Sequence, residues 1–377
     1  MAIPITQAIE KIVFPMLEEQ IKDKRDIAVP YLVGPPGIGK TQMFEQECLK
    51  RGWGLLNVCF PTIPLEELTG MPRGKEVKIK INGDEKQTFI TEWSLPELVS
   101  ILYELAQNYP VVVFFLDDNH LCDEYHQSML FSLLTDGKLK MNKLPSNCVL
   151  AAAGNRTVRA GARNLFSAVV ARIASIDVTV DVEHWLKVYA KEKGLNPLVT
   201  AFIQQNPHML LGEESNEPWP CPREWTYLAN ALSRIIGNVK TVDEDFLNEL
   251  VKAHVGKQAA AEFIQFVKII KEIDAESIIN GKVKPEIKNL KDAWVIGIAC
   301  TLWILSRPRL DKKLLEKYIR NAYIPIYQAT QEVAIMLLSF VKMRSSKALT
   351  DIVTVMENID RDMVTNFCSL ILEASTS

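Results

Sequence analysis

The sequence lacks paired cysteines, long apolar runs and a strong excess of charge of either sign. Its seven cysteines lie singly, with no C-x-x-C pair, so we expect neither a zinc knuckle nor a disulfide framework. We expect the thiols to be reduced. The net charge of -3 argues against a dominant nucleic-acid surface, although a local basic patch would not alter that sum. What remains is globular material, 377 residues with 48% apolar and 24% charged side chains, enough for two or three domains.

No segment reads as a membrane span or a leader. The most hydrophobic stretch, 293–305, is shorter than the roughly 20 residues that cross a bilayer, so a buried helix is expected there. The start, MAIPITQAIEKIVF, has no basic beginning followed by a continuous apolar core, which excludes the usual signal peptide. Internal repeats and low-complexity tracts are also missing. We therefore expect no membrane partner and a cytoplasmic location.

The first half alternates short β-rich apolar runs with helical spacing, the pattern of a parallel sheet covered by helices. Because proline cannot donate to a central ladder, the first strand is expected to begin just after Pro30. The predicted strands are 31–33, 55–59, 111–116, 148–153 and 173–180, and the predicted helices are 41–50, 95–108, 125–135 and 165–170.

From residue 182 onward the spacing is helical, with no convincing strand. Helices are expected over 182–193, 197–205, 222–236, 242–254 and 256–270, and again after the loop NGKVKPEIKN. The later aromatic residues recur at helical spacing, which is more typical of a core than of a binding face: Trp294, Trp303, Tyr318, Tyr323 and Tyr327. The sequence thus predicts three domains, 1–181, 182–272 and 273–377.

Two hairpins interrupt the sheet layer, at about 75–92 and 136–147. In the first, apolar residues and lysines alternate before an Asn-Gly turn: Val77, Lys78, Ile79, Lys80 and Ile81 precede Asn82 and Gly83. The second is shorter and more ambiguous. One interpretation is that both are solvated ribbons whose lysines discourage sheet pairing.

The segment GPPGIGKT fits the phosphate-loop pattern G-x-x-x-x-G-K-[ST] and lies between a predicted strand and a predicted helix. Its glycines permit the sharp path that aims backbone N–H groups at phosphate oxygens, and the helix adds its positive end. Lys40 then offers a charge to the outer phosphates and Thr41 a hydroxyl to Mg²⁺. The predicted nucleotide-binding residues are Gly34, Pro35, Pro36, Gly37, Ile38, Gly39, Lys40, Thr41 and Gln42.

The run VVVFFLDD reads as a buried strand that ends in two acids at the carboxyl edge of the sheet. Asp117 is predicted to hold Mg²⁺, and Asp118 to orient the attacking water. Alternatively, the two acids begin a loop or cap the next helix. His120 and His126 suggest a transition metal, but Mg²⁺ already accounts for the acids.

The order GPPGIGKT, FFLDD, LAAAGNR, VVARI and CPREW resembles that of AAA+ ATPases. The two hairpins, with PLEELTGMP before the first and VGKQAAAEFIQFV later, make the chain most similar to the MoxR-like branch (helix-2-insert group), including short phage and prokaryotic members. The resemblance covers about 27–267. Asp118 departs from it, because this family usually has glutamate there. The shorter acid sits about 1.5 Å further back, and a displacement of that order costs roughly a hundredfold in rate.

The resemblance also implies roles for later polar residues. Asn155 looks like sensor 1, near the γ-phosphate, or it is a plain turn residue. Arg172 resembles the arginine finger that completes a neighbouring subunit's site, with Arg156, Arg159 and above all Arg163 as rivals. Arg223 looks like sensor 2, acting in cis or in trans, or it is an ordinary arginine at a helix start.

Two further roles follow from the same resemblance. Asn57 is either the polar switch that restrains the catalytic acid or a buried strand asparagine satisfied by backbone. The hairpins would point toward the axis of a ring, where Lys78 and Lys80 would touch a client.

Taken together, the resemblance implies an α/β P-loop AAA+ domain, an all-α lid and a helical C-terminal extension. It implies an ATP- and Mg²⁺-dependent ATPase that forms a homo-oligomer, a hexameric ring, in a prokaryotic or phage-infected cell. The client would be a protein, often one with a von Willebrand A domain. Two alternatives stay open. One is a DNA-directed AAA+ ATPase of replication, packaging or defence, and the other is an ATP-gated scaffold with incidental turnover.

Overall fold

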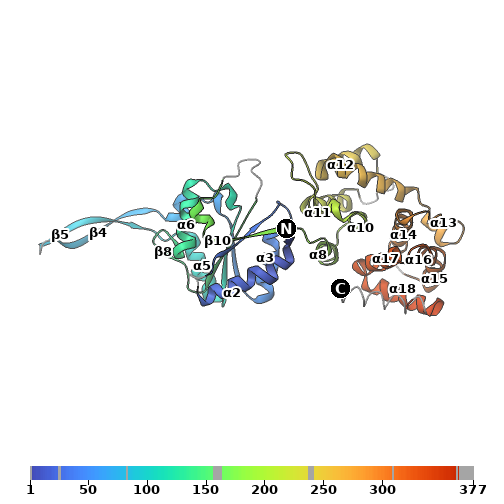
Figure 1. Ribbon diagram of the computed structural model, residues 1–377, viewed down its shortest axis with the longest axis horizontal. Helices are drawn as coiled ribbons and strands as arrows, with labels where there is room; N and C mark the ends of the chain where they lie inside the picture. Colours follow the sequence, from blue (N-terminus) through green and yellow to red (C-terminus); the bar gives the residue numbers. More distant parts are fainter. Residues whose placement is uncertain are drawn as a thin grey trace. The chain divides into compact units, whose positions relative to one another are not determined.

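The computed structural model describes residues 2–23, 27–81, 84–155, 164–236, 242–307, 310–361 and 364. Contacts divide the chain into two units, Met1–Asp181 (unit 1) and Val182–Ser377 (unit 2), both drawn in Figure 1. Unit 1 is an α/β unit and unit 2 is helical. The predicted boundaries of three domains, including the one after residue 272, stay predictions.

Unit 1 is built on a six-stranded sheet with the strand order β1-β10-β2-β9-β6-β3. Every neighbouring pair is parallel, which confirms the predicted parallel sheet. The strands are β1 (Ile3–Pro4), β2 (Val29–Val33), β3 (Gly54–Cys59), β6 (Val112–Asp117), β9 (Cys148–Gly154) and β10 (Ile173–Thr179).

The first predicted strand is two residues longer than expected, because β2 includes Pro30. The backbone N–H of Val29 donates to the Arg172 carbonyl, toward β10. Successive residues of a parallel strand direct their backbone groups to opposite sides, so the nitrogen of Pro30 faces β9. Pairing with β9 begins only at Tyr31. The missing N–H of Pro30 therefore removes no bond from the ladder.

Helices cover both faces of this sheet. On one face Phe115 of β6 packs on Phe44 of α3, with ring centroids 4.3 Å apart. On the other face Phe114 belongs to a buried cluster with residues of α5 and α6. A strand buried on both faces reads as a continuous apolar run, as this one does. The helices of unit 1 are α1 (Ile5–Ala8), η1 (Ile9–Val13), α2 (Phe14–Lys22), α3 (Lys40–Arg51), η2 (Phe60–Thr62), α4 (Leu65–Thr69), α5 (Glu97–Asn108), η3 (Asn119–Leu121), α6 (Glu124–Asp136) and α7 (Ser167–Val170).

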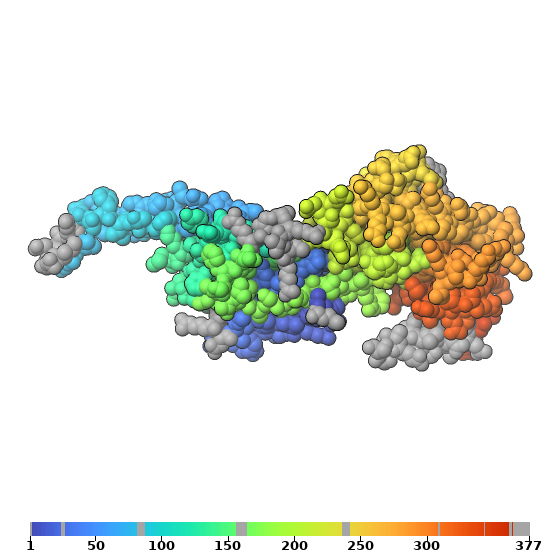
Figure 2. Space-filling view, turned by 45° about the horizontal axis from the view of Figure 1, so that its top comes forward, coloured from blue at the N-terminus to red at the C-terminus, as the bar shows by residue number. Residues whose placement is uncertain are grey.

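Two small antiparallel ribbons accompany the sheet without joining it. The long one pairs β4 (Pro72–Ile81) with β5 (Asp84–Trp93) over their full length, and it extends away from the sheet and helices of unit 1 (Figures 1 and 2). The short one pairs β7 (Lys138–Leu139) with β8 (Asn142–Lys143). The predicted turn residues 82 and 83 lie outside the described residues. The ammonium of Lys140 lies over the Trp93 ring, which joins the two ribbons.

In unit 2 the described residues form helices and loops. A long helix, α12, contains Gly256 at φ 75° and ψ 173°, and a Cβ there would lie 2.2 Å from the Pro218 carbonyl oxygen. The helix bends at Gly256, one residue after the predicted break at residue 255, because only glycine fits this backbone conformation. The helices are α8 (Val182–His184), η4 (Trp185–Tyr189), α9 (Ala190–Glu192), α10 (Pro197–Gln205), η5 (Pro207–Leu210), α11 (Pro222–Ala231), η6 (Leu232–Ile236), α12 (Glu244–Glu272), α13 (Ala275–Ile279), α14 (Leu290–Leu305), α15 (Lys312–Tyr318), η8 (Ile319–Tyr323), α16 (Ile324–Ala329), α17 (Gln331–Arg344) and α18 (Ser346–Ile359).

The hydrophobic stretch expected as a buried helix is α14, whose residues form much of the core of unit 2. Trp294, Tyr318 and Tyr323 are fully buried, and the Tyr318 hydroxyl lies 2.8 Å from the hydroxyl of Thr301. These three aromatic residues therefore belong to the core, as predicted. Across the described part of the chain, none of the helices has the length and hydropathy that a bilayer crossing requires.

Candidate nucleotide site

The glycine-rich segment forms a turn between β2 and α3, at the carboxyl edge of the sheet. Gly37 and Gly39 have φ angles of 78° and 96°, in the region that favours glycine. The N–H of Gly34 donates to the Gly154 carbonyl over 3.3 Å, which anchors the start of the turn to β9. Because α3 begins at Lys40, the positive end of its dipole faces the turn. An anion-binding geometry is thus built from backbone alone.

The ammonium group of Lys40 folds back over this turn. Its Nζ atom donates to the Gly34 carbonyl at 2.9 Å and to the Pro35 carbonyl at 3.1 Å. A lysine held in the turn places its charge where phosphate oxygens would lie. The predicted loop residues are therefore gathered in one place.

Thr41 and Asp117 meet across the sheet edge. The Thr41 hydroxyl donates to Oδ2 of Asp117 over 2.5 Å, although β9 lies between the strands that lead to them. A hydroxyl beside a carboxylate offers the hard oxygen ligands that Mg²⁺ takes in nucleotide sites. These two residues fit the predicted metal role chemically.

Asp118 has a left-handed backbone, with φ 55°, a conformation that aspartate tolerates better than most residues. Its N–H donates to Oδ1 of Asp117 at 2.9 Å. Its side chain makes no capping bond to the helix that follows. The cap of α6 is instead Asp123, which accepts the His126 N–H. The side chains of the two strand-end acids therefore do not cap α6, and the alternative that the acids begin a loop stays open.

One side chain that contacts Asp118 among the described residues is Cys59, at the end of β3. Its thiol lies 3.9 Å from Oδ2 of Asp118, within reach of a weak S–H hydrogen bond. Burial raises the pKa of the Cys59 thiol, and the negative charges of Asp118 and Asp117 raise it further. The thiol therefore stays protonated and able to donate.

Asn57 is the residue that the sequence predicted would restrain the acid. It is exposed on β3, the edge strand of the sheet, so the alternative of a buried asparagine is wrong, while the switch role stays a prediction. Cys59 pairs in register with Asp117, whereas Asn57 pairs with Phe115, further down the strand. Register therefore decides which residue reaches the acids.

Asn119 is a site residue that sequence reasoning passed over. It is fully buried, and its amide donates to the Leu116 carbonyl at 2.6 Å and to the Ala153 carbonyl at 3.4 Å. These bonds fasten the acid turn to both β6 and β9. A polar residue directly after a buried strand and two acids was the available signal.

Two further predicted site residues of unit 1, Asn155 and Arg172, lie at opposite edges of the sheet. Asn155 directly follows β9, and so lies at the carboxyl edge beside the phosphate turn. Arg172 precedes β10 at the opposite, amino edge, and a seven-residue strand spans about 20 Å. Its Nη1 donates to the Ala168 carbonyl at 2.7 Å, and its guanidinium lies 4.4 Å from the centroid of the Phe131 ring. Arg172 therefore makes its contacts from the edge of the sheet opposite its own phosphate turn.

Arg223 lies in unit 2, as the second residue of α11, with an exposed side chain. The rival arginines, Arg156, Arg159 and Arg163, lie outside the described residues. His120 and His126 do not belong to any metal-binding cluster of three or more His, Cys, Asp or Glu within the described ranges.

No protein-family model matches the sequence, and no curated protein matches it. Among solved structures, the chain is similar to Thermotoga maritima RuvB, a Holliday junction branch migration motor, with 14% identity and a TM-score of 0.35 over 86% of this chain and 87% of that one. It is also similar to Hsp104 of S. cerevisiae in its extended complex with casein, with 18% identity and a TM-score of 0.37 over 82% of this chain and 50% of that one. These identities and TM-scores are too low to support an inference about function.

Proposed function

We propose that the chain is an AAA+ ATPase of the MoxR-like branch, which binds ATP with Mg²⁺ and hydrolyses it. The observation that carries this is the 2.5 Å contact of Thr41 with Asp117 below a glycine turn that holds Lys40. The N–H groups of the turn and the first turn of α3 bind the phosphates, and Lys40 neutralises the outer ones. Thr41 and Asp117 would hold Mg²⁺, which when bound would supply additional charge neutralisation.

In this proposal Asp118 orients the attacking water. Its left-handed backbone and the hydrogen bond from its N–H to Asp117 fix the position from which its side chain extends. Asn155, at the end of the neighbouring β9, supplies a second polar contact near the terminal phosphate. The shorter acid makes turnover slow, because the carboxylate sits further from the water than a glutamate's would.

Arg172 completes the site of a neighbouring copy. Its location at the amino edge of the sheet, opposite the phosphate turn, supports a role in trans. Such a head-to-tail contact closes into a ring when the rotation between copies allows, and we propose six copies. Arg223 adds a cation from unit 2 to one of these sites.

The proposed work of the ring is to remodel a partner protein, by family analogy one with a von Willebrand A domain. The β4–β5 ribbon, with exposed Lys78 and Lys80, is the proposed contact. ATP turnover would change the angle between units and so move this ribbon.

Asp118→Asn tests the hydrolytic part. Asparagine tolerates the left-handed backbone as well as aspartate does, so the variant should fold. We expect it to bind Mg²⁺·ATP with unchanged affinity in calorimetry and to release no phosphate, while the unaltered chain turns over. Turnover equal to that of the unaltered chain would remove Asp118 from the mechanism. Because such a variant holds ATP without consuming it, it should also retain the client in a pull-down.

A DNA-directed ATPase is the second candidate. The observation that favours it is Phe89, 73% exposed on the same face of the ribbon as Lys78, since aromatic rings beside lysines suit bases and phosphates. Fluorescence anisotropy with a labelled single-stranded oligonucleotide tests it. Binding that weakens with salt and with Lys78→Ala and Lys80→Ala would support this candidate.

A further inference from the structure

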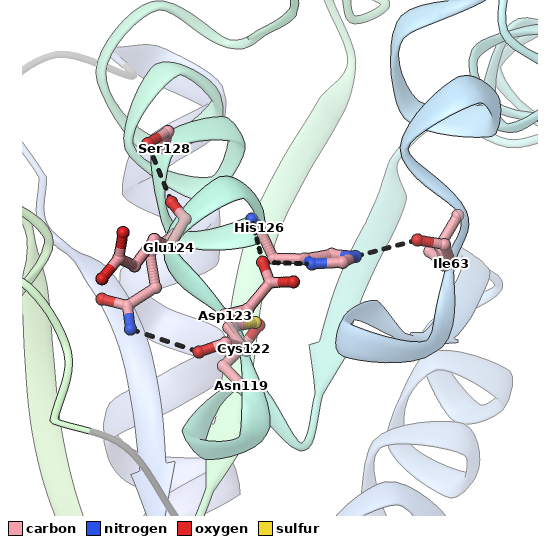
Figure 3. A network of polar contacts seen from close by, with 8 residues as sticks. Ile63, Asn119, Cys122, Asp123, Glu124, His126 and Ser128 are labelled. Carbon is pink, nitrogen blue, oxygen red and sulfur yellow. Dashed lines mark hydrogen bonds and ion pairs between the residues drawn. The ribbon is translucent and has the colours of Figure 1, made fainter.

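His126 lies in the first turn of α6, with its ring between two oxygen atoms (Figure 3). Its Nδ1 is 2.7 Å from Oδ1 of Asp123, and its Nε2 is 2.8 Å from the Ile63 carbonyl oxygen. The residue is only 8% exposed, and the Phe60 ring packs edge-on against it. A carbonyl oxygen can only accept, so Nε2 carries a hydrogen and donates it to Ile63.

This bond joins two segments that both lead away from the proposed nucleotide site. On one side, the acid turn continues into η3, where the Leu121 N–H donates to the Asp118 carbonyl at 2.9 Å, and then into α6. On the other side, Cys59, which contacts Asp118, is followed by η2 and Ile63. His126 therefore ties the helix after the acids to the chain after β3.

From Ile63 the chain leads directly to the long ribbon. Helix α4 ends at Thr69, and Met71 and Ser94 close the base of the ribbon. The Met71 N–H donates to Oγ of Ser94 at 2.8 Å, and the Ser94 N–H donates to the Met71 carbonyl at 2.9 Å. A displacement of Ile63 would thus reach the ribbon through one short helix and a closed base.

We propose that His126 is a positioning residue that couples the acid turn to the β4–β5 ribbon through its bond to Ile63. The inference rests on the proposed function, because ATP at the phosphate turn is the signal. When the acid turn adjusts to bound ATP, α6 moves with it, and the His126–Ile63 bond passes that movement to the base of the ribbon. A histidine that only filled space would leave the ribbon's response to ATP unchanged.

Two substitutions separate the two bonds of the ring. In His126→Gln the side-chain amide nitrogen lies near the position of Nε2 and still donates to Ile63. In His126→Asn the amide lies near Nδ1 and cannot reach Ile63. The matched control is His208→Asn, which changes an exposed histidine in η5 of unit 2. All are made in the full chain with Asp118→Asn, so that ATP is bound and not consumed.

Hydrogen–deuterium exchange followed by mass spectrometry reads out the ribbon with and without Mg²⁺·ATP. We expect ATP to slow exchange in the peptide over 34–42 in every variant. Exchange in the ribbon peptide, 72–93, should also change when ATP is added to the parent protein, to the His126→Gln variant and to the His208→Asn control. That change should be lost in His126→Asn, with ATP affinity unaltered.

The proposal is overturned if the ribbon ignores ATP in the parent, or if His126→Asn responds as the parent does. Should His126→Asn not fold by circular dichroism, Asp123→Ser decides, because serine keeps the helix cap but removes the carboxylate that orients the ring. A ribbon response as large as the parent's in Asp123→Ser then overturns it. If ATP fails to protect even 34–42, the proposed function fails with it, which distinguishes the two outcomes.

Discussion

The hydroxyl of Thr41 lies 2.5 Å from the Asp117 carboxylate, although the two residues are 76 positions apart in the chain. Helix α3 carries one and the end of β6 the other, with β9 between β2 and β6. Parallel strands end at a common edge, so the sheet itself brings the glycine turn and the acids together. The geometry of the proposed nucleotide site therefore follows from the sheet topology.

Removing this hydroxyl should weaken Mg²⁺-dependent ATP binding. Thr41→Val keeps the shape of the side chain and deletes the oxygen. A hydrogen bond to a charged group is worth about 1.5–3 kcal/mol, so the dissociation constant should rise about 10- to 150-fold. Calorimetry with and without Mg²⁺ measures this. Thr135→Val, which alters an exposed hydroxyl on α6, is the control and should bind normally. Equal affinity in both variants would rule out the metal role of Thr41.

The glycine in α12 gives a stability prediction for unit 2. Gly256→Ala forces a Cβ toward the Pro218 carbonyl, in a backbone region that is nearly restricted to glycine. Such strain costs about 1–3 kcal/mol, so the thermal transition of the helical unit should fall. Lys257→Ala, at the exposed neighbouring position, should leave it unchanged. Far-UV circular dichroism on heating compares them, and a melting temperature unchanged by Gly256→Ala would show that the bend tolerates a side chain.

The buried thiol of Cys122 predicts a loss of stability in alkali. Burial raises its pKa from 9.0 to about 12, and the charge of Asp123 adds to the rise. Above about pH 9 the unfolded chain releases this proton while the folded chain keeps it, so the free energy of unfolding falls as pH rises, by up to about 1.4 kcal/mol per pH unit. Cys122→Ala should therefore flatten the decline measured by urea unfolding between about pH 9 and 10. The exposed hydroxyl variant Ser128→Ala should keep the full slope, and equal slopes in both would show that this thiol does not contribute.

The sequence was sufficient for five of the six strands and for the phosphate turn, because both signals are local, whereas β1 has only two residues and leaves no apolar run to detect. Apolar runs of strand length mark the sheet, and glycines followed by Lys40 and Thr41 specify a turn that few other structures need. The inclusion of Pro30 in β2 was not predictable from the sequence. It is possible because the backbone nitrogen of Pro30 faces β9, and pairing with β9 begins only at Tyr31. That is a property of the assembled sheet.

The contact between Cys59 and Asp118 could not be predicted from the sequence either, because it too depends on the assembled sheet. Asn57 and Cys59 share one strand, and the register of β3 on β6 places only Cys59 beside the acids. The bond from His126 to Ile63 joins residues 63 positions apart and needs the loop after β3 to fold back over α6. The roles of Asn155, Arg172 and Arg223 stay predictions.

Mixing two inactive proteins tests the central claim, that one copy holds ATP and its neighbour completes the site. The Arg172→Ala protein still has Asp118, and the Asp118→Asn protein still has Arg172. Where the nucleotide pocket of an Arg172→Ala copy faces Arg172 of an Asp118→Asn copy, the site is therefore complete. In a ring assembled at random from equal amounts, about a quarter of the contacts have this arrangement. We predict that each variant alone binds ATP and releases no phosphate, and that the mixture regains turnover. A mixture as inactive as its components, with both still binding ATP, would contradict the account.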